Sequence, residues 1–301
     1  SGLFVDAVND LASWFGSRGV KTITFVNGPN DGGEGPTPPE TPIERGGEGP
    51  ISAKWTRPPE VIGEPFAGAS ARQRDADRIA EARIAPAGAA LTLVTSHSQL
   101  NWILIPYVHV PPARLMRAFE SALEAVFGKS LDKKEIIRSA RDPAGRAKLR
   151  TCYDALWCNH NLVSMTLYSG PTRWQPNDTR IRAGSSHHYF SPRHCAGGWI
   201  LTGDAQLNSP RRRQAFLHYY RNFTPLTNVF MLPHHGSIHN HSAMVLSAMP
   251  NLAIGYAASG PNSYGHPHRD VCDEVDAHGS AQFHRVGQRP STRLKIKVEL
   301  T

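Results

Sequence analysis

The segment WILTGDAQLNSPRRRQAFLHYYRNFTPLTNVFMLPHHGS, residues 199–237, decides the fold class. It opens with a short apolar run that ends in the acidic residue of TGD, and it closes with a second apolar run that ends in two histidines. Between these runs the sequence has helical character. A strand, a helix and a strand in this order predict a layered α/β architecture, in which functional sites form at the ends of strands.

The flanking sequence extends this pattern in both directions. Downstream we expect a helix at 242–249 and strands at 251–262 and 291–300; upstream we expect a strand at 161–170 and a polar loop at 171–197. In the first half of the chain we expect helices at 3–15 and 75–85, a strand at 20–28, two strands within 89–110 and a helical insertion at 112–157. Residues 28–68 are expected to form a Gly/Pro-rich surface loop. We interpret residues 1–301 as one domain.

Composition excludes several classes of protein. The chain of 301 residues has four cysteines and no CxxC pair, which argues against a disulfide scaffold and favours reduced thiols and a cytoplasmic location. No stretch approaches the roughly 18 apolar residues of a membrane span, and no secretory leader is recognisable at the start. Residues 171–301 contain 14 basic and 7 acidic side chains, a balance that suits either an anionic partner such as nucleic acid or a basic solvated face.

Residues suited to metal binding concentrate in the second half. Ten of the 15 histidines fall between His187 and His268. Asp204 follows one predicted strand, and His234 and His235 follow the next one. Carboxylate and imidazole together favour zinc, manganese or iron, although a lone GD turn or a pair of solvated histidines is the commoner origin of either motif.

The order of these motifs resembles the metallo-β-lactamase superfamily, and within it the hydrolase domain of bacterial competence DNA-uptake channels, the ComEC-type branch. The resemblance rests on NLVSMTLYSG (161–170), WILTGDAQL (199–207), MLPHHGSIHNHS (231–242) and AIGYAASGPNSYGHP (253–267). It implies a four-layer αββα sandwich and a metal centre, expected to hold two Zn or Mn ions, between the edges of its two sheets. The activity implied is hydrolysis by a metal-activated water.

The resemblance also assigns roles to individual residues. Asp204 corresponds to the bridging carboxylate, and a histidine of HHGS corresponds to a ligand of the second metal, with His235 favoured over His234. His266 of the loop 262–267 is expected to contact a phosphate or to protonate a leaving group, or else to hold the loop by a structural hydrogen bond. Ser237, Asn262 and Asn161 are candidate substrate contacts, and His160 is a candidate metal ligand.

Two departures from the family pattern stand out. The first metal motif of the superfamily, HxHxDH, occurs nowhere in the sequence. Because residues 1–15 look like the helix that follows this motif, we expect this chain to begin just downstream of it, without the first strands; a chain that never had the motif would be inactive. The ligand expected before Asp204 is also ambiguous among Asn159, His160 and Asn161, since 171–197, with His187, His188 and His194, lengthens the interval.

The substrate class is left with several alternatives. DNA is the first choice because RRR at 211–213 and further basic residues near the end could follow a phosphate backbone. Tyr219, Tyr220 and Phe223 could stack on bases, but they are more simply read as packing their helix onto the sheet. The other interpretations are a small-molecule phosphoesterase or lactonase of the same fold, an inactive binding or scaffold protein, and an effector that docks a protein partner through 112–157.

Overall fold

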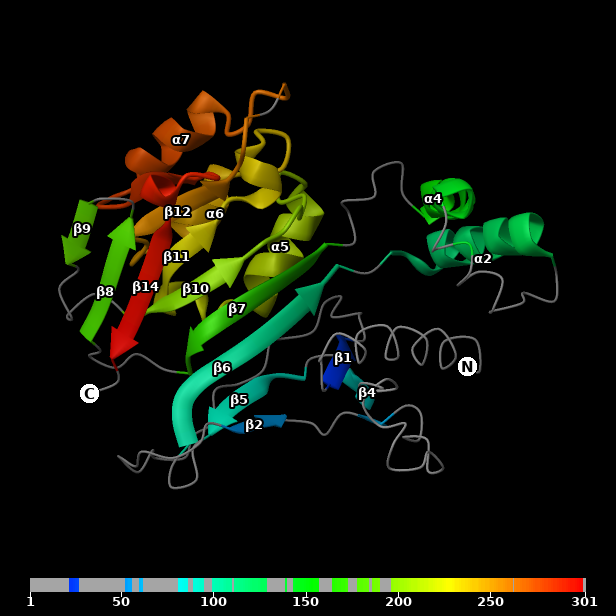
Figure 1. The fold of residues 1–301 in the computed structure, drawn as a ribbon, viewed down its shortest axis with the longest axis horizontal. Helices are drawn as coiled ribbons and strands as arrows, with labels where there is room; N and C mark the ends of the chain where they lie inside the picture. The colour runs from blue at the N-terminus through cyan, green and yellow to red at the C-terminus, as the bar shows by residue number, and fades with distance from the viewer. Residues whose placement is uncertain are drawn as a thin grey trace, which may run out of the picture. The chain divides into compact units, whose positions relative to one another are not determined.

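The computed structural model describes the chain mainly from residue 196 onward (Figure 1). The described residues are 22–26, 52–55, 60–61, 81–85, 89–94, 99–109, 111–128, 139, 143–156, 164–172, 178–183, 186–189, 196–261 and 263–299. The chain divides into two compact units, which we describe separately: one of 1–28, 57–87 and 110–160, and a larger one of 29–56, 88–109 and 161–301.

A mixed β-sheet forms the framework of the larger unit. Its strand order is β13-β12-β11-β10-β7-β6-β5-β2. The strands are β2 (Ser52–Trp55), β5 (Leu91–Val94), β6 (Gln99–Val108), β7 (Met165–Pro171), β10 (Gly198–Leu201), β11 (Thr227–Met231), β12 (Ile254–Ala258) and β13 (Gln282–Val286). The predicted strands at 89–110 and 161–170 are confirmed as β5, β6 and β7, which pair antiparallel.

The strands β10 to β13 run parallel to one another. Helix α5 (Pro210–Tyr219) follows β10, helix α6 (Ala243–Ser247) follows β11, and helix α7 (Arg269–Asp276) follows β12. Pro210 at the first position of α5 suits the helix start, where its missing N–H would have no partner. Because parallel strands end at the same edge of a sheet, the loops after β10, β11, β12 and β13 lie along one edge.

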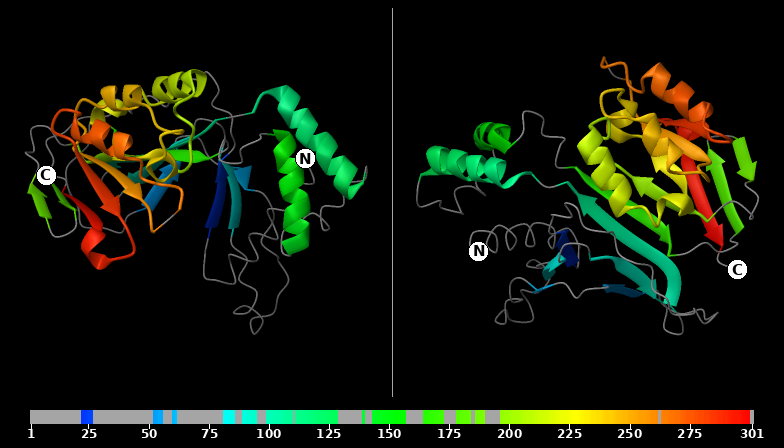
Figure 2. Two further views of the ribbon diagram at one scale, coloured as in Figure 1. Left: turned by 90° about the horizontal axis from the view of Figure 1, so that it is seen from above. Right: turned by 180° about the vertical axis from the view of Figure 1, so that it is seen from behind.

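The main core lies between this sheet and its helices (Figure 2). Alternate strand residues such as Ile200, Phe230 and Ala257 point to it and meet Phe216, Tyr219, Tyr220, Val245, Leu246, Val271 and Val275 of the helices. Tyr219 and Tyr220 are almost fully buried, and their hydroxyls donate to the carbonyl oxygens of Pro106 and Ile105 at 3.1 and 2.9 Å. Packing of this helix onto the sheet, the simpler interpretation of these aromatics, is therefore confirmed.

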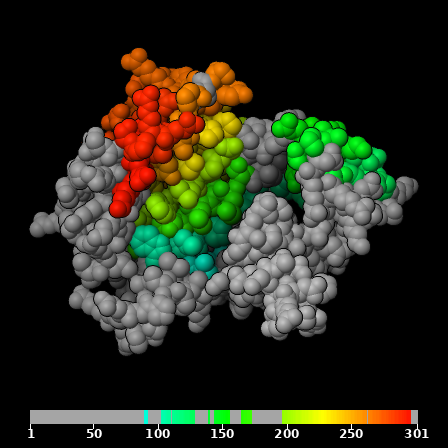
Figure 3. Space-filling view, in the orientation of Figure 1, coloured from blue at the N-terminus to red at the C-terminus, as the bar shows by residue number. Residues whose placement is uncertain are grey.

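The opposite face of the sheet is covered in part by a second, smaller sheet. On this face Val229, Ala253 and Ile254 are buried against Trp199, Tyr256 and Leu294. Leu294 begins β14 (Leu294–Glu299), which pairs antiparallel with β8 (Asp178–Ala183), and β8 pairs with β9 (Ser186–Tyr189). In Figure 3 the residues leading into β14, coloured red, lie at the surface beside α7. The prediction of a loop throughout 171–197 is wrong for β8 and β9, since β8 pairs with β14 and β9 pairs with β8.

The described residues of the smaller unit form a three-stranded sheet and two helices. The sheet order is β1-β4-β3, from Thr22–Val26, Glu81–Ala85 and Glu60–Val61. The predicted helix at 75–85 is wrong for 81–85, because these residues pair with β1 as a parallel strand. Helices α2 (Ala113–Phe127) and α4 (Pro143–Leu156) confirm the helical character of 112–157. The predicted helix at 3–15 lies outside the described residues, as does most of the predicted loop at 28–68. The loop prediction is wrong for 52–55 and 60–61, because these residues pair with β5 and β4 as the strands β2 and β3.

No helix in the part of the chain that the structure describes has both the length and the apolar character needed to cross a membrane.

Candidate active site at the carboxyl ends of the parallel strands

Three loops of the larger unit bring together most of the described residues that the sequence singles out. Asp204 follows β10, His234 and His235 follow β11, and His266 follows β12. Their side chains meet because the three strands are neighbours in the sheet and share one direction. The candidate site therefore lies at the carboxyl edge of the parallel part of the sheet.

The backbone around Asp204 is held on both sides. The buried Thr202 hydroxyl donates to the carbonyl oxygen of Met231 at 2.7 Å, which ties the end of β10 to the end of β11. Gly203 has a φ of +52°, a left-handed conformation that glycine adopts without steric cost. The Asn240 side-chain amide donates to the carbonyl oxygen of Asp204 at 3.1 Å. These contacts fix the main chain of Asp204 and leave its carboxylate at the surface.

The Asp204 carboxylate meets the imidazole of His234. His234 Nδ1 lies 3.5 Å from Asp204 Oδ1, and the His234 backbone N–H donates to the carbonyl oxygen of Gly203 at 2.8 Å. The side chains are 36% and 27% exposed, for Asp204 and His234 respectively. An exposed pair of this kind contributes at most about 1 kcal/mol to stability, so its arrangement is better explained by chemistry than by folding.

The two histidines occupy strained backbone. His234 has φ 47° and His235 has φ 58°, within the short 3₁₀ segment η3 (Pro233–Gly236). The left-handed region costs a residue with a Cβ about 1–2 kcal/mol, although histidine is among the residues that enter it more often. Two such residues in succession persist only where surrounding structure imposes them, and such strain concentrates at functional sites.

His235 is oriented by the neighbouring strand. Its Nδ1 lies 2.5 Å from the carbonyl oxygen of Ala258 at the end of β12. Because a carbonyl only accepts, Nδ1 carries the proton and Nε2 keeps its lone pair. A hydrogen bond from one ring nitrogen to a backbone carbonyl is how metal-binding histidines are usually oriented. The preference for His235 over His234 as a metal ligand stays a prediction; the recorded contact with Asp204 is made by His234.

His266 lies beside this pair. Its ring centroid is 5.5 Å from that of His234, edge to face at 86°, and its other neighbour is Tyr264, stacked at 6.2 Å and 81% exposed. Burial lowers the pKa of His266, and the nearby imidazoles of His234, His235, His239 and His268 lower it further. His266 is therefore neutral near pH 7 until an anion approaches it.

The loop with His266 is held against the segment Pro233–Gly236, which we call the histidine corner. The His268 N–H donates to the Gly236 carbonyl oxygen at 3.0 Å, and a Cβ on Gly236 would lie 2.7 Å from the Cβ of Pro267. Asn240, Ala258 and Pro267 were not predicted as site residues. A signal for Asn240 was its place in the motif at 231–242, whereas Ala258 acts through its carbonyl and carries no side-chain signal.

The remaining predicted residues are placed less directly. Ser237 is buried, and its hydroxyl accepts from the His239 N–H at 3.3 Å, so its role as a substrate contact stays a prediction. His160, Asn161 and Asn262 lie outside the described residues, as do Asn159 and His194. His187 and His188 lie in β9. Arg212 and Arg213 of the predicted basic run bond to Gln206 Oε1, to the Asn208 carbonyl oxygen and to Ser242 Oγ.

The donor set suits a divalent metal in its chemistry, though the described ligands are incomplete. A carboxylate and imidazoles are ligands typical of zinc and manganese. Within the described ranges no group of three or more His, Cys, Asp or Glu side chains is arranged to hold an ion. The Asp204–His234 contact therefore supplies two neighbouring donors, and His160, a third candidate, is not described.

Comparisons with protein-family models, with curated proteins and with solved structures give no match for this chain.

Proposed function

We propose that this chain is a metal-dependent hydrolase, most simply a phosphodiesterase that cleaves DNA. The observation that carries the proposal is the contact of the Asp204 carboxylate with the His234 imidazole, at an edge that also holds His235 and His266. These residues come from three separate loops. His234 and His235 are held in strained backbone, and the Asp204–His234 pair remains open to solvent. A purely structural role would not require this combination.

Among the described groups, the neighbouring donors Asp204 and His234 would contribute to a site for a divalent ion, and His235 would contribute its Nε2 atom to the second ion. Such an ion supplies a lowered pKa for a coordinated water and positive charge against a phosphate oxygen. Two ions and the His160 ligand belong to the same proposal. The proposed αββα sandwich has four layers. The helices, the mixed sheet and the small sheet of the larger unit are consistent with three of them.

The protein groups around this position have distinct roles. The Ala258 carbonyl fixes the proton of His235 on Nδ1 and so directs Nε2 outward. His266, neutral in the free protein, hydrogen-bonds a phosphate oxygen when the substrate binds. The negative charge of that phosphate raises the pKa of His266, so that the imidazole takes up a proton from solvent, and the imidazolium then donates this proton to the leaving oxygen.

DNA is favoured as substrate by the charge of this part of the chain. Residues 171–301, which contain the site, have 14 basic and 7 acidic side chains. A positive surface attracts the phosphate backbone independently of sequence, and the attraction weakens steeply with salt.

The test is cleavage by the full chain with Mn²⁺ or Zn²⁺, on supercoiled plasmid, on single-stranded DNA and on a small aryl phosphodiester. We expect the DNA substrates to be cleaved, and Asp204→Asn to lower the rate at least about a hundredfold, since a metal ion at the reacting centre contributes several kcal/mol. Asp273→Asn, on the exposed face of α7, is the matched control and should keep wild-type activity.

Absence of cleavage of every substrate with either metal would refute the proposal. Cleavage of the small diester alone would replace DNA by a small-molecule substrate, and full activity in Asp204→Asn would show that the centre lies elsewhere. His234→Ala, compared with the exposed His218→Ala on α5, repeats the test on the second member of the pair.

A further inference from the structure

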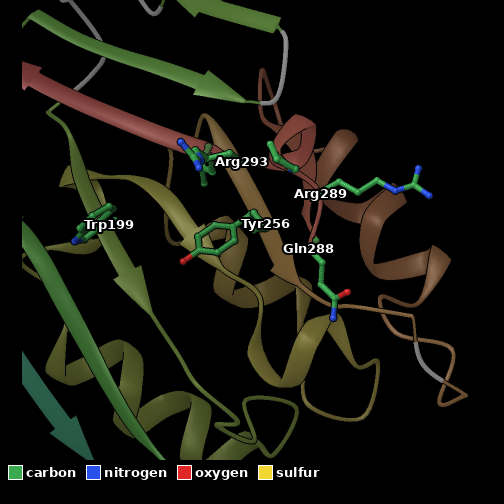
Figure 4. Close-up of a pocket in the computed structure, with 9 residues that line it drawn as sticks. Trp199, Tyr256, Gln288, Arg289 and Arg293 are labelled. Carbon is green, nitrogen blue, oxygen red and sulfur yellow. The ribbon is translucent and has the colours of Figure 1, made fainter.

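A concave feature, separate from the candidate active site, lies on the face of the sheet away from the three helices. It is a pocket of about 450 Å³ lined by residues of β10, of β12 and of the segment between β13 and β14 (Figure 4). Its volume is within the range of small-molecule sites, roughly 300–1,000 Å³. None of the residues proposed for the active site lines it, so it requires its own explanation.

The base of the pocket is aromatic. Trp199 of β10 and Tyr256 of β12 are half-buried and pack against Val229 and Ile254 of the sheet. Leu294 closes the same cluster from β14. Side chains that are held by a sheet lose little freedom when a ligand binds, and aromatic rings stack on nucleobases of any sequence.

The charged side chains of the pocket are both cationic. Arg289 and Arg293 line it, no acidic residue is among its lining residues, and neither guanidinium has an ion pair or hydrogen bond within the described part of the chain. In Figure 4 the Arg289 side chain extends away from Tyr256, so Arg293 is the nearer cation. Burial raises the pKa of Tyr256 to about 12, which keeps its hydroxyl protonated. The pocket is therefore suited to a ligand with an apolar ring and a negative charge.

The pocket is linked to the candidate active site through β12 and β13. Tyr256 precedes by two residues the Ala258 carbonyl that orients His235. The Arg285 guanidinium, at the end of β13, donates to the carbonyl oxygen of Gly260, which leads into the loop with His266. Both features therefore belong to neighbouring strands of the same parallel edge.

We propose that this pocket binds one nucleotide, with its base against Trp199 and Tyr256 and its phosphate at Arg293 and, at the rim, Arg289. The inference rests on the proposed function where the nucleotide belongs to the DNA strand being cleaved; a free mononucleotide presents the same chemistry. As part of a strand, the bound nucleotide would place a neighbouring phosphate toward the histidine corner.

The test measures binding to the full-length Asp204→Asn variant by calorimetry, with thymidine 5′-monophosphate, thymidine and inorganic phosphate as probes. We expect the monophosphate to bind more tightly than either fragment. Trp199→Leu should weaken it about tenfold, the effect of losing one stacking contact, while Trp199→Phe largely keeps it. Arg293→Gln should weaken the monophosphate and leave thymidine unchanged. Arg221→Gln, an exposed arginine on the helical side of the sheet, is the control.

Equal affinity of the monophosphate for all four variants would overturn the inference, as would inorganic phosphate binding as tightly as the nucleotide. Arg293 is exposed, so loss of folding would not disguise the result for its variant. A single-stranded oligonucleotide that binds more tightly than the monophosphate, with the same losses, identifies the strand as the source; preference for the monophosphate identifies a free nucleotide. Nucleotide binding without DNA cleavage by the wild type refutes the proposed function alone, and cleavage without nucleotide binding refutes the pocket alone.

Discussion

Gly236 and Pro267 are packed so closely that a Cβ on Gly236 would lie 2.7 Å from the Cβ of Pro267. Gly236 also has a φ of +82°, which favours glycine. The contact joins the end of the histidine corner to the loop with His266. The relative position of these two loops thus depends on glycine, which has no side chain, at position 236.

Gly236→Ala is expected to lower the free energy of unfolding by about 2 kcal/mol or more, because the added methyl both strains the backbone and displaces Pro267. Urea denaturation measures this. Gly279→Ala is the matched control, since Gly279 has a φ of +59° but nothing within 4 Å of an added Cβ. Equal losses in both variants would show that backbone conformation alone, and not the contact with Pro267, requires glycine at 236.

Asp204→Asn should separate activity from stability. The Asp204–His234 pair is partly exposed, so its loss is expected to change the free energy of unfolding by less than about 1 kcal/mol. Hydrolytic activity should nevertheless fall as proposed above. Denaturation and rate measurements on the same preparation check both parts, and a loss of several kcal/mol would indicate a structural role for the carboxylate.

His235→Gly is expected to be more stable than His235→Ala by about 1–2 kcal/mol, because only glycine enters the left-handed region freely. At His218, in helix α5, the order should reverse, with glycine about 1 kcal/mol less stable than alanine. Thermal and urea unfolding of the four variants measure this. An alanine variant at 235 as stable as the glycine variant would mean that position 235 is not held at positive φ.

The contact between the buried His241 and the exposed Glu274 predicts a loss of stability in acid. Burial lowers the pKa of His241, and the Glu274 carboxylate, 2.9 Å from His241 Nε2, only partly opposes this. Since the unfolded chain then binds a proton at a higher pH than the folded chain, the contribution of His241 is complete above its ordinary value of about 6.5 and declines as the pH falls below it.

Unfolding free energies at pH 7.5 and pH 5 for the wild type, His241→Gln and the exposed control His218→Gln measure this contribution. The decrease in the free energy of unfolding from pH 7.5 to pH 5 should be smaller in His241→Gln than in the wild type and in His218→Gln. The same decrease in all three would assign the acid sensitivity to other groups.

The sequence predicts the alternation of strands and helices from 198 to 258 because apolar runs there coincide with real burial. Prediction from the sequence fails where strand pairing overrides the conformational preference of the individual residues. Residues 81–85, EARIA, contain good helix formers but pair with β1 as a strand. Residues 178–183, DTRIRA, are polar enough to suggest a loop, although Thr, Ile and the period-two alternation were a signal for the strand that β14 completes.

For the site, the motif residues Asp204, His234 and His266 could be named from the sequence, but their relations could not. Which histidine contacts Asp204 depends on the left-handed backbone at 234 and 235, which no residue pattern specifies. The role of Ala258 depends on register with the neighbouring strand, and the pocket at Trp199 and Tyr256 depends on which face of the sheet each residue occupies. These are properties of strand pairing, not of composition.

The parallel order of β10, β11 and β12 has a consequence for studying fragments of this protein. Three different strands lead into Asp204, the histidine corner and His266. A peptide therefore brings these residues together only if the sheet forms. A fragment ending before residue 254 would keep Asp204 and His234 but lose both the carbonyl that orients His235 and the loop with His266. The hydrolysis proposed above would then require the whole parallel edge to be assembled, and limited proteolysis within this edge should abolish the activity in one step.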